Sequence, residues 1–379
     1  MSEWKKCPIG EVVTLRQGFA INAKSKHYMS KEETSLPLLR IADMKNGTKE
    51  VFVKEEIPQR FIAHPEDIIY TRTGNVGLVF RNNYGVMHNN CFSVTPNDAD
   101  ELSRDFLYYA LQNKTFFDTA NALARGAAQP DLPHTSFNSI EFAYPSLFVQ
   151  ERIAYILSRY DSLIENYQKQ IKLLEEAAQR LYKEWFIDLH FPEHENTNII
   201  DGVPEGWEKK KVGEVIAKVP RSKQIPTKDY HKEGAIPIID QSRDYIAGYT
   251  DDIESRVESN EPYIVFGDHT RILKYVPFPF AKGADGTQLI MSNNLDLMPQ
   301  CLLFTSLVSV DLSNYSYARH FKYLKEEEIL VPTASIANAF SKHVAKWYAK
   351  IQLNREQLRF LTEARDRLLP KLMSGEITV

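Results

Sequence analysis

The chain has 379 residues, of which 43% are apolar and 25% are charged, and these proportions exclude a disordered or collagen-like chain. The length predicts two or three domains. The formal net charge is −4, which argues against binding to nucleic acid by bulk positive charge alone. Any DNA contact must therefore come from local basic patches or from a partner.

The compartment is predicted from what the sequence lacks. No apolar run reaches the ~18 residues of a membrane span, and the first ten residues lack the apolar segment of a signal peptide. The three cysteines, Cys7, Cys91 and Cys301, lie far apart and form neither a CxxC pair nor a disulfide framework. We expect a cytoplasmic protein without membrane contact, whose cysteines are reduced and serve as small apolar side chains.

The sequence of the first segment of the chain is partly repeated later, with the same spacing between residues. Trp4–Val13 contains Trp, Gly, Glu and Val, and these residue types return in Trp207–Ile216, 203 residues further on. The apolar run Pro37–Leu39 is followed in the same way by Pro237–Ile239. Each apolar run predicts a buried strand that leads into a polar loop. The sequence therefore predicts an internal repeat.

The repeat continues toward two long helical segments. Asp67–Arg72 and Pro262–Asp268 each predict a strand that enters a polar turn. Further on, Glu141–Pro145 matches Glu328–Pro332. A Ser or Thr follows each of these prolines and is a plausible N-cap for the helical pattern behind it.

Both helical segments carry apolar residues at alternating spacings of four and three, which is the heptad pattern of a coiled coil. In the first segment these positions are Ile153, Leu157, Tyr160, Ile164, Tyr167, Ile171, Leu174, Ala178, Leu181 and Trp185. The equivalent positions 187 residues later are Phe340, Val344, Trp347, Ile351, Asn354, Leu358, Leu361, Arg365, Leu368 and Leu372. Because one chain holds two such seams, the simplest way to bury them is against each other.

The sequence thus predicts two similar globular domains, each followed by a long helix, and a pseudo-twofold repeat. The predicted boundaries are 1–145 and 191–332 for the two domains and 146–190 and 333–379 for the helices. We expect the helices to pack as an antiparallel coiled coil. Asn354 and Arg365 fall on the seam, where a polar residue either fixes register or marks a locally exposed position. Pro370 is expected to kink or end the second helix.

A pair of similar domains on a rigid helical pair suits a target that is itself in two halves, such as duplex DNA. Both domains open with basic segments, which we interpret as loops. Lys5–Lys31 holds six Lys or Arg and one acid, and Lys209–Lys232 holds eight and two. Lys and Arg contacts to phosphates supply most sequence-independent affinity for DNA. The alternative is an ordinary solvated surface.

Base recognition relies on Arg for guanine and on Asn or Gln for adenine. Side chains of these kinds stand in loops after predicted strands or shortly before the helices, for example in 71–75, 125–129, 267–271 and 317–320. A single Arg in such a loop is more often structural than a base contact. The candidate DNA-binding residues are Arg40, Arg72, Thr73, Asn75, Arg125, Gln129, Arg221, Lys223, Arg243, Asp268, His269, Thr270, Arg271, Arg319 and His320.

Catalytic motifs are not found in the sequence. There is no P-loop, no Asn-Pro-Pro-aromatic segment and no Gly-rich loop suited to S-adenosylmethionine. His190 and His194 are separated by Pro192, so they cannot share a helical face as zinc-protease ligands do. We therefore expect no catalytic residues, no cofactor and no metal.

Several segments together resemble the specificity subunits of type I restriction-modification systems (HsdS). They are Val203–Trp207, Asp67–Gly74, Gln150–Ala154 and, above all, Leu368–Ile377. The loop Gly267–Arg271 followed by Gly283–Thr287 resembles one kind of second recognition domain in that family. The resemblance covers essentially the whole chain and includes its repeat order.

The resemblance implies a subunit that is not itself a catalyst. Each α+β domain of such a protein recognises one half of a split double-stranded DNA target. The two helices set the gap and dock two modification subunits, which carry the adenine methyltransferase chemistry. Restriction subunits, which translocate and cut DNA with ATP, complete the full complex.

Two other classes of protein remain open. The first is a restriction-methyltransferase fusion that has kept only its specificity part, which would need catalytic motifs that this sequence lacks. The second is a coiled-coil scaffold that binds proteins rather than DNA. A scaffold explains the heptads but not the duplicated basic openings or the paired strand-to-turn loops.

Overall fold

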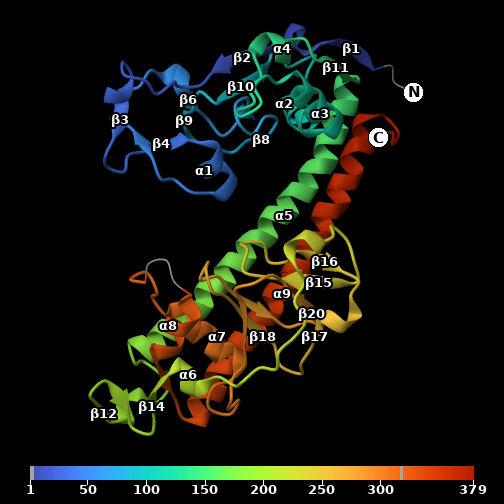
Figure 1. Cartoon of the computed structure of the whole chain (residues 1–379). Coiled ribbons are helices and arrows are strands. Elements are labelled where there is room, and N and C mark those ends of the chain that lie inside the picture. Colours follow the sequence, from blue (N-terminus) through green and yellow to red (C-terminus); the bar gives the residue numbers. More distant parts are fainter. Residues whose placement is uncertain (1–3, 316–318) are drawn as a thin grey trace. The chain divides into compact units, whose positions relative to one another are not determined.

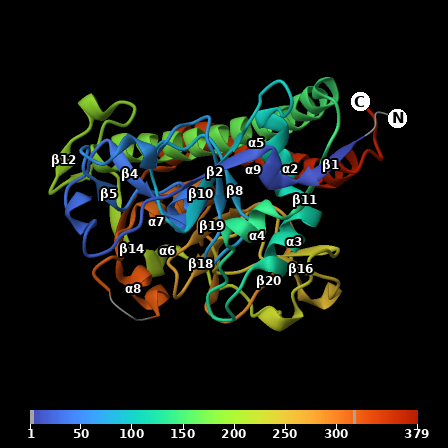
Figure 2. The same cartoon turned by 90° about the horizontal axis from the view of Figure 1, so that it is seen from above.

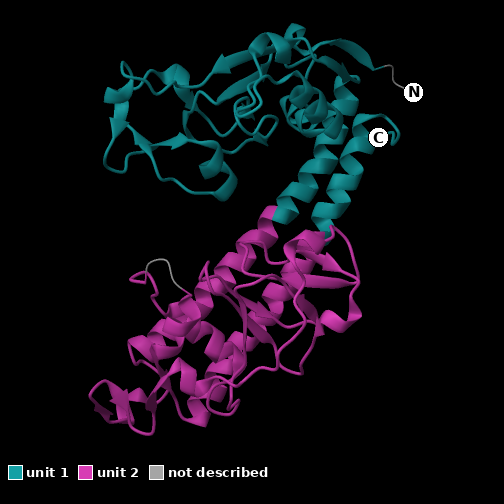
Figure 3. Ribbon diagram, in the orientation of Figure 1, with its two compact units in different colours: residues 1–164, 360–379 teal, residues 165–359 magenta. Residues whose placement is uncertain are grey.

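The computed structural model describes residues 4–315 and 319–379, and the chain divides into two compact units (Figure 3). Unit 1 consists of residues 1–164 and 360–379, and unit 2 of residues 165–359. The long helices α5 (Leu147–Tyr182) and α9 (Ala334–Met373) each contribute to both units (Figure 1). Both helices begin directly after the predicted capping positions, Ser146 and Thr333.

Unit 1 mixes short strands with helices, as an α+β fold predicts. The order of strands in its sheets is β1-β11, β2-β10-β7-β8 and β3-β5-β4-β9-β6. Its helices include α1 (Ile41–Asn46), α2 (Arg104–Gln112), α3 (Lys114–Leu123) and α4 (His134–Asn138). Its strands are β1 (Lys5–Pro8), β2 (Val13–Gln17), β3 (Met29–Ser30), β4 (Leu36–Leu39), β5 (Phe52–Val53), β6 (Ile62–Ala63), β7 (Ile68–Thr71), β8 (Val79–Phe80), β9 (Gly85–Met87), β10 (Cys91–Pro96) and β11 (Glu141–Tyr144).

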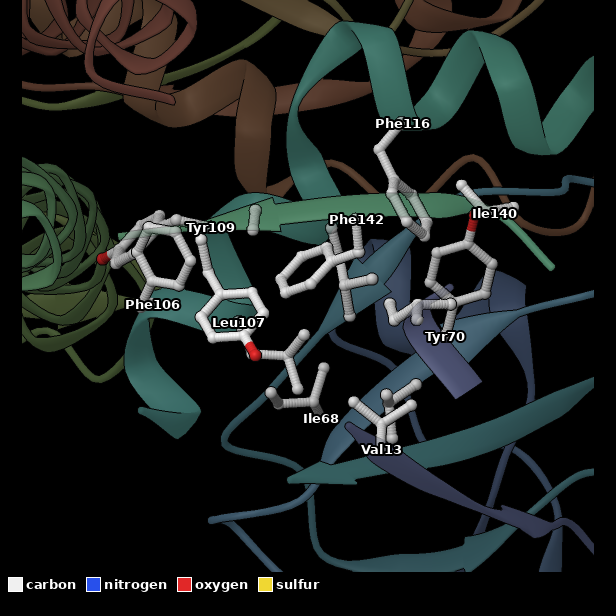
Figure 4. Packing of buried hydrophobic residues seen from close by; sticks show 14 of the residues in the cluster. Val13, Ile68, Tyr70, Phe106, Leu107, Tyr109, Phe116, Ile140 and Phe142 are labelled. Atoms are coloured by element: carbon white, nitrogen blue, oxygen red, sulfur yellow. The ribbon is translucent and has the colours of Figure 1, made fainter. Parts of the chain in front are cut away.

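The main core of unit 1 lies where α2, α3 and α4 pack on the sheet of β2, β7 and β10. Figure 4 shows Tyr70, Phe116 and Ile140 grouped at one end of this core and Phe106 and Tyr109 at the other. Burial of these large side chains excludes water from the sheet face, at roughly 1.5–3 kcal/mol for each fully buried apolar side chain. The core fixes the strands whose ends carry the polar loops described below.

Unit 2 has the same mixture of elements. The order of strands in its sheets is β12-β13, β14-β22, β16-β15-β20-β17 and β19-β18-β21. Its helices include α6 (Val212–Val215), α7 (Gln300–Ser309) and α8 (His320–Glu326). Its strands are β12 (Ile199–Ile200), β13 (Val203–Pro204), β14 (Glu208–Lys211), β15 (Ile236–Ile239), β16 (Gly248–Thr250), β17 (Arg256–Val257), β18 (Tyr263–Gly267), β19 (Leu273–Val276), β20 (Phe280–Lys282), β21 (Thr287–Ile290) and β22 (Glu328–Val331).

Several strand pairings occur in both units. In unit 1, β4 pairs in parallel with β9, and β7 pairs antiparallel with both β10 and β8. In unit 2, β15 pairs in parallel with β20, and β18 pairs antiparallel with both β21 and β19. Each unit also has an antiparallel pair just before its long helix, β1 with β11 and β14 with β22.

Within each unit, α5 and α9 lie side by side (Figures 1 and 2). In unit 1, Arg365 Nη1 on α9 donates to Asp161 Oδ1 on α5 at 2.9 Å. In unit 2, Asn354 Nδ2 donates to Gln170 Oε1 at 3.2 Å, and Phe340 packs against Tyr182 with ring centroids 6.3 Å apart. Residue numbers fall along α9 as they rise along α5, so the helices run antiparallel inside unit 2.

The predicted seam faces inward at many of its positions. Ile153, Leu157, Ala178, Phe340 and Val344 are fully buried. Leucines off the seam are more open, because Leu163 is 48% exposed and Leu173 is 52% exposed. The heptad positions therefore identify the apolar face of each helix.

The two polar seam residues occupy different environments. Asn354 is fully buried, and its side chain contacts Gln170 across the helices. Arg365 is ion-paired with Asp161 on α5. Neither is a simple exposed break in the seam, so both contribute specific polar contacts between the helices.

Of the two effects expected of Pro370, a kink or an end of the second helix, the end is wrong. Helix α9 continues to Met373, although Pro370 lies within it. Proline removes one backbone donor, but Pro370 is exposed and stands in the last turn. Only one hydrogen bond is lost there, so the helix tolerates it.

The prediction of basic loops at the start of each domain is also wrong for the first lysines of each segment. Lys5 and Lys6 lie on β1, and Lys209–Lys211 lie on β14. Lys6 pairs with Glu141 at 3.3 Å and Lys209 pairs with Glu328 at 2.8 Å. The neighbouring strand supplies acidic partners to these lysines, which the local sequence could not reveal.

Candidate nucleic-acid interface

The polar loops of unit 1 gather at one edge because of how its strands pair. β4 and β9 are parallel, so their carboxyl ends share an edge, where Arg40 follows β4 and the segment 88–90 follows β9. β7 is antiparallel to β10, so Arg72 after β7 meets Asn90 before β10. The backbone N–H of Arg72 donates to the carbonyl of Asn90 at 2.8 Å.

Asp131 holds two of these loops together. Its carboxylate accepts from Arg72 Nη2 at 2.7 Å, from Arg72 Nε at 3.2 Å and from Thr73 Oγ1 at 2.5 Å. Its backbone exchanges two hydrogen bonds of 2.8 Å with Arg125. The hydrogen bonds from Arg72 lower the pKa of the Asp131 carboxyl. Arg72 is therefore oriented by a charged acceptor, and its Nη1 also donates to Gln17 Oε1 at 3.2 Å.

The structure brings together five of the six first-domain candidates. Arg72, Thr73 and Asn75 stand on one loop and Arg125 and Gln129 on the other. The loops are joined again by Gly74 N–H, which donates to Pro130 O at 2.8 Å. The side chains of Asn75, Arg125 and Gln129 are exposed. This pair of loops presents an amide, a guanidinium and a second amide to solvent.

Arg40, the sixth candidate, is occupied by carboxylates. It donates to Asp43 at 2.6 and 2.9 Å and to Glu50 at 2.6 Å. The hydrogen bonds from Arg40 lower the pKa of the buried Asp43 carboxyl. Two acids thus compete with any phosphate for this guanidinium.

Gln241 plays the joining role in unit 2. Its Nε2 donates to Asp285 O at 2.9 Å, its Oε1 accepts from His269 N–H at 3.1 Å, and its backbone carbonyl accepts from Thr270 Oγ1 at 2.7 Å. These contacts connect the loops that follow β15, β18 and β20. His269 and Thr270 are exposed on this connected edge.

Asp268 and His320 are buried, with 3% exposure each. The Asp268 carboxylate accepts from Phe321 N–H at 2.8 Å, in the first turn of α8. The His320 ring lies 2.9 Å from Asp268 O through Nδ1 and 3.1 Å from Tyr315 O through Nε2. These two side chains hold the loop to α8 rather than facing solvent.

Arg271 extends the same connection. Its φ of 62° places it in the left-handed region, where a non-glycine residue is uncommon. Its backbone N–H donates to Gly267 O at 2.8 Å, and its Nη2 donates to Tyr315 O at 2.7 Å. The side chain as a whole is exposed.

The remaining second-domain candidates, Arg221, Lys223, Arg243 and Arg319, do not take part in the contacts of Gln241 and Asp268 described above. Lys223 is ion-paired with Asp252 at 2.7 Å and Glu254 at 3.3 Å. Arg221, Arg243 and Arg319 are exposed. Arg319 directly precedes α8, and its predicted loop neighbours Tyr317 and Ala318 lie outside the described residues.

Sequence reasoning missed several polar residues at these edges, namely Gln17, His88, Asn89, Asn90, Asp131 and Gln241. The segment 88–90 follows a strand of only three residues, β9, which is too short to give a periodic pattern. Gln241 carried a usable signal, because it stands just behind the apolar run that matches Pro37–Leu39. Asp131 carried none, since its partner Arg72 is 59 residues away.

Among residues 4–315 and 319–379, no group of three or more His, Cys, Asp or Glu side chains is arranged to hold a metal ion. No helix in this described part of the chain is long and apolar enough to span a membrane. The edges of the two units instead carry arginine, amide and hydroxyl groups, which suit hydrogen bonding to bases and phosphates.

Comparison with known proteins defines the class. Residues 1–176 match the family described as type I restriction modification DNA specificity domain. The whole chain resembles the crystal structure of the type I restriction-modification system S subunit from M. genitalium. The TM-score is 0.63 at 18% identity, and the match covers 98% of this chain and 96% of that chain. The likeness in fold supports the mixed helix-and-strand architecture with long helices.

Curated relatives carry the same name. The chain is 29% identical over 314 residues to the type I restriction enzyme MjaIX specificity subunit of Methanocaldococcus jannaschii, covering 76% of this chain and 72% of the relative. It is 21% identical to the HindI specificity subunit of Haemophilus influenzae over the full length of both. The resemblance to type I restriction-modification specificity subunits is thus confirmed, and the predicted non-catalytic class is the class of these relatives.

Proposed function

We propose that this chain is the DNA-specificity subunit of a type I restriction-modification complex and recognises a bipartite double-stranded target, one half-site with each unit. The observation that carries the proposal is the shared pairing scheme of the two units. In each unit a parallel pair, β4 with β9 or β15 with β20, brings polar loops to one strand edge. Two similar but non-identical edges suit two different half-sites.

The proposed domain organisation follows the strand pairs that close each unit. Residues 1–145 and 191–332 are the two recognition domains, related by an internal pseudo-twofold repeat. Residues 146–190 and 333–379 are spacer helices that form an antiparallel coiled coil and set the gap between half-sites. The contacts of Asp161 with Arg365 and of Gln170 with Asn354 support this pairing.

The candidate residues take different roles in this proposal. Base contacts come from side chains on the joined loops. In the first domain these are the exposed Asn75, Arg125 and Gln129 together with the partly buried Arg72, and in the second domain they are the exposed His269, Thr270 and Arg271. Phosphate contacts come from the exposed Arg221, Arg243 and Arg319. Thr73, Asp268 and His320 position these loops. Arg40 and Lys223 make no DNA contact in this proposal, because carboxylates already hold both side chains.

The proposed partners are double-stranded DNA, two modification subunits with adenine methyltransferase activity, and restriction subunits in the full complex. Helix α5 supports protein docking, because it carries large apolar side chains off the seam. Phe148 is 69% exposed, Tyr155 is 53% exposed and Leu173 is 52% exposed. A cytoplasmic location follows from this proposed role on cellular DNA.

The test is to co-express the chain with the methyltransferase gene beside its own, in a host without adenine methylation. Single-molecule sequencing then maps every methylated adenine. We expect one split motif with a fixed unspecified gap. Assembly of the complex without methylation would instead favour a scaffold that binds only proteins.

A domain exchange tests the modular organisation. Replacing residues 1–145 with the first domain of a relative should change one half-site and leave the other half-site and the gap intact. Change of both half-sites would contradict the assignment. Inserting four residues near Gln168 adds about 6 Å of helix, and should alter the gap or prevent assembly.

A further inference from the structure

Unit 2 contains a polar cavity beside its loop cluster. The cavity has a volume of about 380 Å³ and is lined by Val219, Pro220, Arg221, Ser222, Gln224, Lys282, Gln288 and Leu289. This volume lies at the small end of ligand sites, so the cavity admits a single small group rather than a duplex groove. Among the described residues that line it, two are cationic and none is acidic.

A hydroxyl in this cavity has no partner. Ser222 Oγ is buried and forms no hydrogen bond among the described residues. An unpaired buried hydroxyl costs about 1–3 kcal/mol, so such groups normally have a partner. The unpaired hydroxyl stands one residue from Arg221, in a cavity that also receives Lys282. It is thus a free donor beside two cations.

Lys282 is half-buried, and burial lowers the pKa of its ammonium group. With the Gln224 amide in the orientation that satisfies both of its ends, Lys282 Nζ donates to the side-chain carbonyl of Gln224 at 3.1 Å, and the Gln224 amide donates to Asp285 Oδ1 at 3.3 Å. The carboxylate of Asp285 is thus held through Gln224 and does not line the cavity. The charge of Asp285 offsets part of this effect of burial, and an anion in the cavity would stabilise the charged form of Lys282 further.

The cavity adjoins the proposed base-recognition edge. The backbone carbonyl of Asp285 accepts from Gln241 Nε2, and Gln241 in turn binds the backbone of His269. A group bound by Arg221 and Lys282 would therefore lie one loop away from His269 and Thr270. This is the relation expected between a phosphate contact and the base contacts whose register it fixes.

The strand path explains why the cavity forms here. In unit 1, β2 pairs with β10 over five residues, from Val13 to Gln17. In unit 2, Ile216 after α6 bridges Ser292, just behind β21, and Gln224 bridges Lys282 on β20, which belongs to a different sheet. The segment between these two bridges passes from one sheet to the other and supplies one wall of the cavity.

We propose that Arg221, Ser222 and Lys282 form a phosphate site that holds one backbone phosphate of the DNA next to the second half-site. This inference rests on the proposed DNA-binding function. The shared chemistry is a phosphate group, which a DNA backbone or inorganic phosphate could supply. The DNA backbone is favoured by the adjoining loop cluster.

The experiment compares variants that each remove one positive charge. Full-length wild type, Arg221→Ala, Lys282→Met and the control Lys223→Ala are titrated with a mixed-sequence DNA duplex between 50 and 200 mM salt. Each phosphate contact contributes about 0.9 to the slope of log K against log salt. Loss of one contact should therefore reduce the fall in affinity over this range by about 3.5-fold.

We expect Arg221→Ala and Lys282→Met to show the reduced salt dependence and Lys223→Ala to retain that of wild type, because Asp252 and Glu254 already neutralise Lys223. Equal effects of Arg221→Ala and Lys223→Ala would overturn the site. A wild-type chain that binds no DNA would instead refute the proposed function itself, and with it the DNA assignment of the site.

Ser222→Ala separates binding from folding. Because the hydroxyl is unpaired, its removal should leave the melting temperature unchanged or raise it, while weakening DNA binding. A lower melting temperature with unchanged DNA binding would show that Ser222 is structural and would overturn its assignment.

In a second arm, inorganic phosphate is titrated into the full chain. One outcome would refute the DNA assignment. In that outcome phosphate stabilises the wild-type chain, Arg221→Ala abolishes this stabilisation, and Arg221→Ala leaves DNA binding unchanged. The cavity would then be a site for free phosphate.

Discussion

Two ion pairs between α5 and α9 have nearly the same geometry but different burial, and we predict that they differ in their contribution to stability. Arg365 lies 2.9 Å from Asp161 in unit 1, and Arg355 lies 2.8 Å from Glu175 in unit 2. The side chain of Asp161 is 13% exposed and that of Glu175 is 47% exposed. Distance alone predicts equal effects, whereas burial predicts unequal ones.

Asp161 is also the acceptor for two other groups. Tyr109 Oη donates to it at 2.6 Å and Arg81 Nη2 at 3.2 Å. Asp161→Asn removes the less exposed carboxylate partner of two arginines, which are 20% and 27% exposed. Arg81 then keeps only the exposed Asp105 at 3.7 Å, and Arg365 keeps only the exposed Asp366 at 2.9 Å. Removal of one partner from a buried pair costs about 3–5 kcal/mol. Since water still reaches part of both arginines, we expect a loss near the lower end, about 3 kcal/mol.

Glu175→Gln is the matched control. Exposed pairs contribute about 0.2–1 kcal/mol, and Arg355 keeps its stacking on Tyr245, with its guanidinium 4.0 Å from the ring centroid. Tyr109→Phe, which removes one donor from Asp161, should cost about 1 kcal/mol. These losses are unfolding free energies of the unit that holds each pair.

Hydrogen exchange measured by mass spectrometry at low urea concentrations reports the two units separately, through the amides of β10 in unit 1 and β18 in unit 2. Asp161→Asn should lower protection of β10 far more than Glu175→Gln lowers protection of β18. Equal losses in the two variants would refute the reasoning from burial.

Three further predictions concern single residues. Lys274 is 4% exposed, lies 3.8 Å from Asp240 and donates to Asp244 O at 2.5 Å, and burial lowers its pKa from 10.5 to about 8. As the pH rises, the folded state therefore loses this proton before the unfolded state does. The unfolding free energy of wild type relative to Lys274→Met should rise by up to about 3 kcal/mol between pH 8 and 10.5 and stay constant below pH 8. A difference in unfolding free energy that does not change with pH would contradict the lowered pKa. Burial raises the pKa of Cys91 to about 12 and also raises the pKa of Cys301. A thiol reagent should therefore modify the partly exposed Cys7 first. Rapid modification of all three thiols in the native chain would argue against the burial of Cys91 and Cys301. Gly283→Ala should lower the melting temperature of unit 2, because its Cβ would lie 2.3 Å from Tyr230 Oη and 2.5 Å from Asp240 Cβ; an unchanged melting temperature would show that the junction adapts.

The sequence predicted the elements whose signals are local. The apolar runs Pro37–Leu39 and Pro237–Ile239 form most of β4 and β15, and the heptads mark the inward faces of α5 and α9. These predictions succeeded because hydrophobic periodicity reflects the burial of the same residues that carry it.

Other features depend on partners that are distant in sequence. Arg72 was singled out for its residue type, but its orientation is set by Asp131, which no local pattern identifies. From the sequence Lys209 was predicted to lie in a basic loop, whereas in the structure it is ion-paired with Glu328 on the neighbouring strand β22. Asp268 and His320 were chosen as polar loop residues, yet α8 buries both. The local sequence identifies which side chains could bind DNA, whereas only the tertiary fold decides whether such a side chain faces solvent or another side chain.

The pairing of β1 with β11 has a consequence for how the first unit changes length. Lys5 stands opposite Tyr144, and Pro8 stands opposite Glu141, so the segment 5–144 begins and ends on adjacent strands about 4.8 Å apart. Doubling the length of a flexible loop inside this segment costs only about 0.6 kcal/mol of closure entropy. Insertions inside the unit therefore leave the start of α5 in place, and the size of the recognition segment is uncoupled from the helix that follows it.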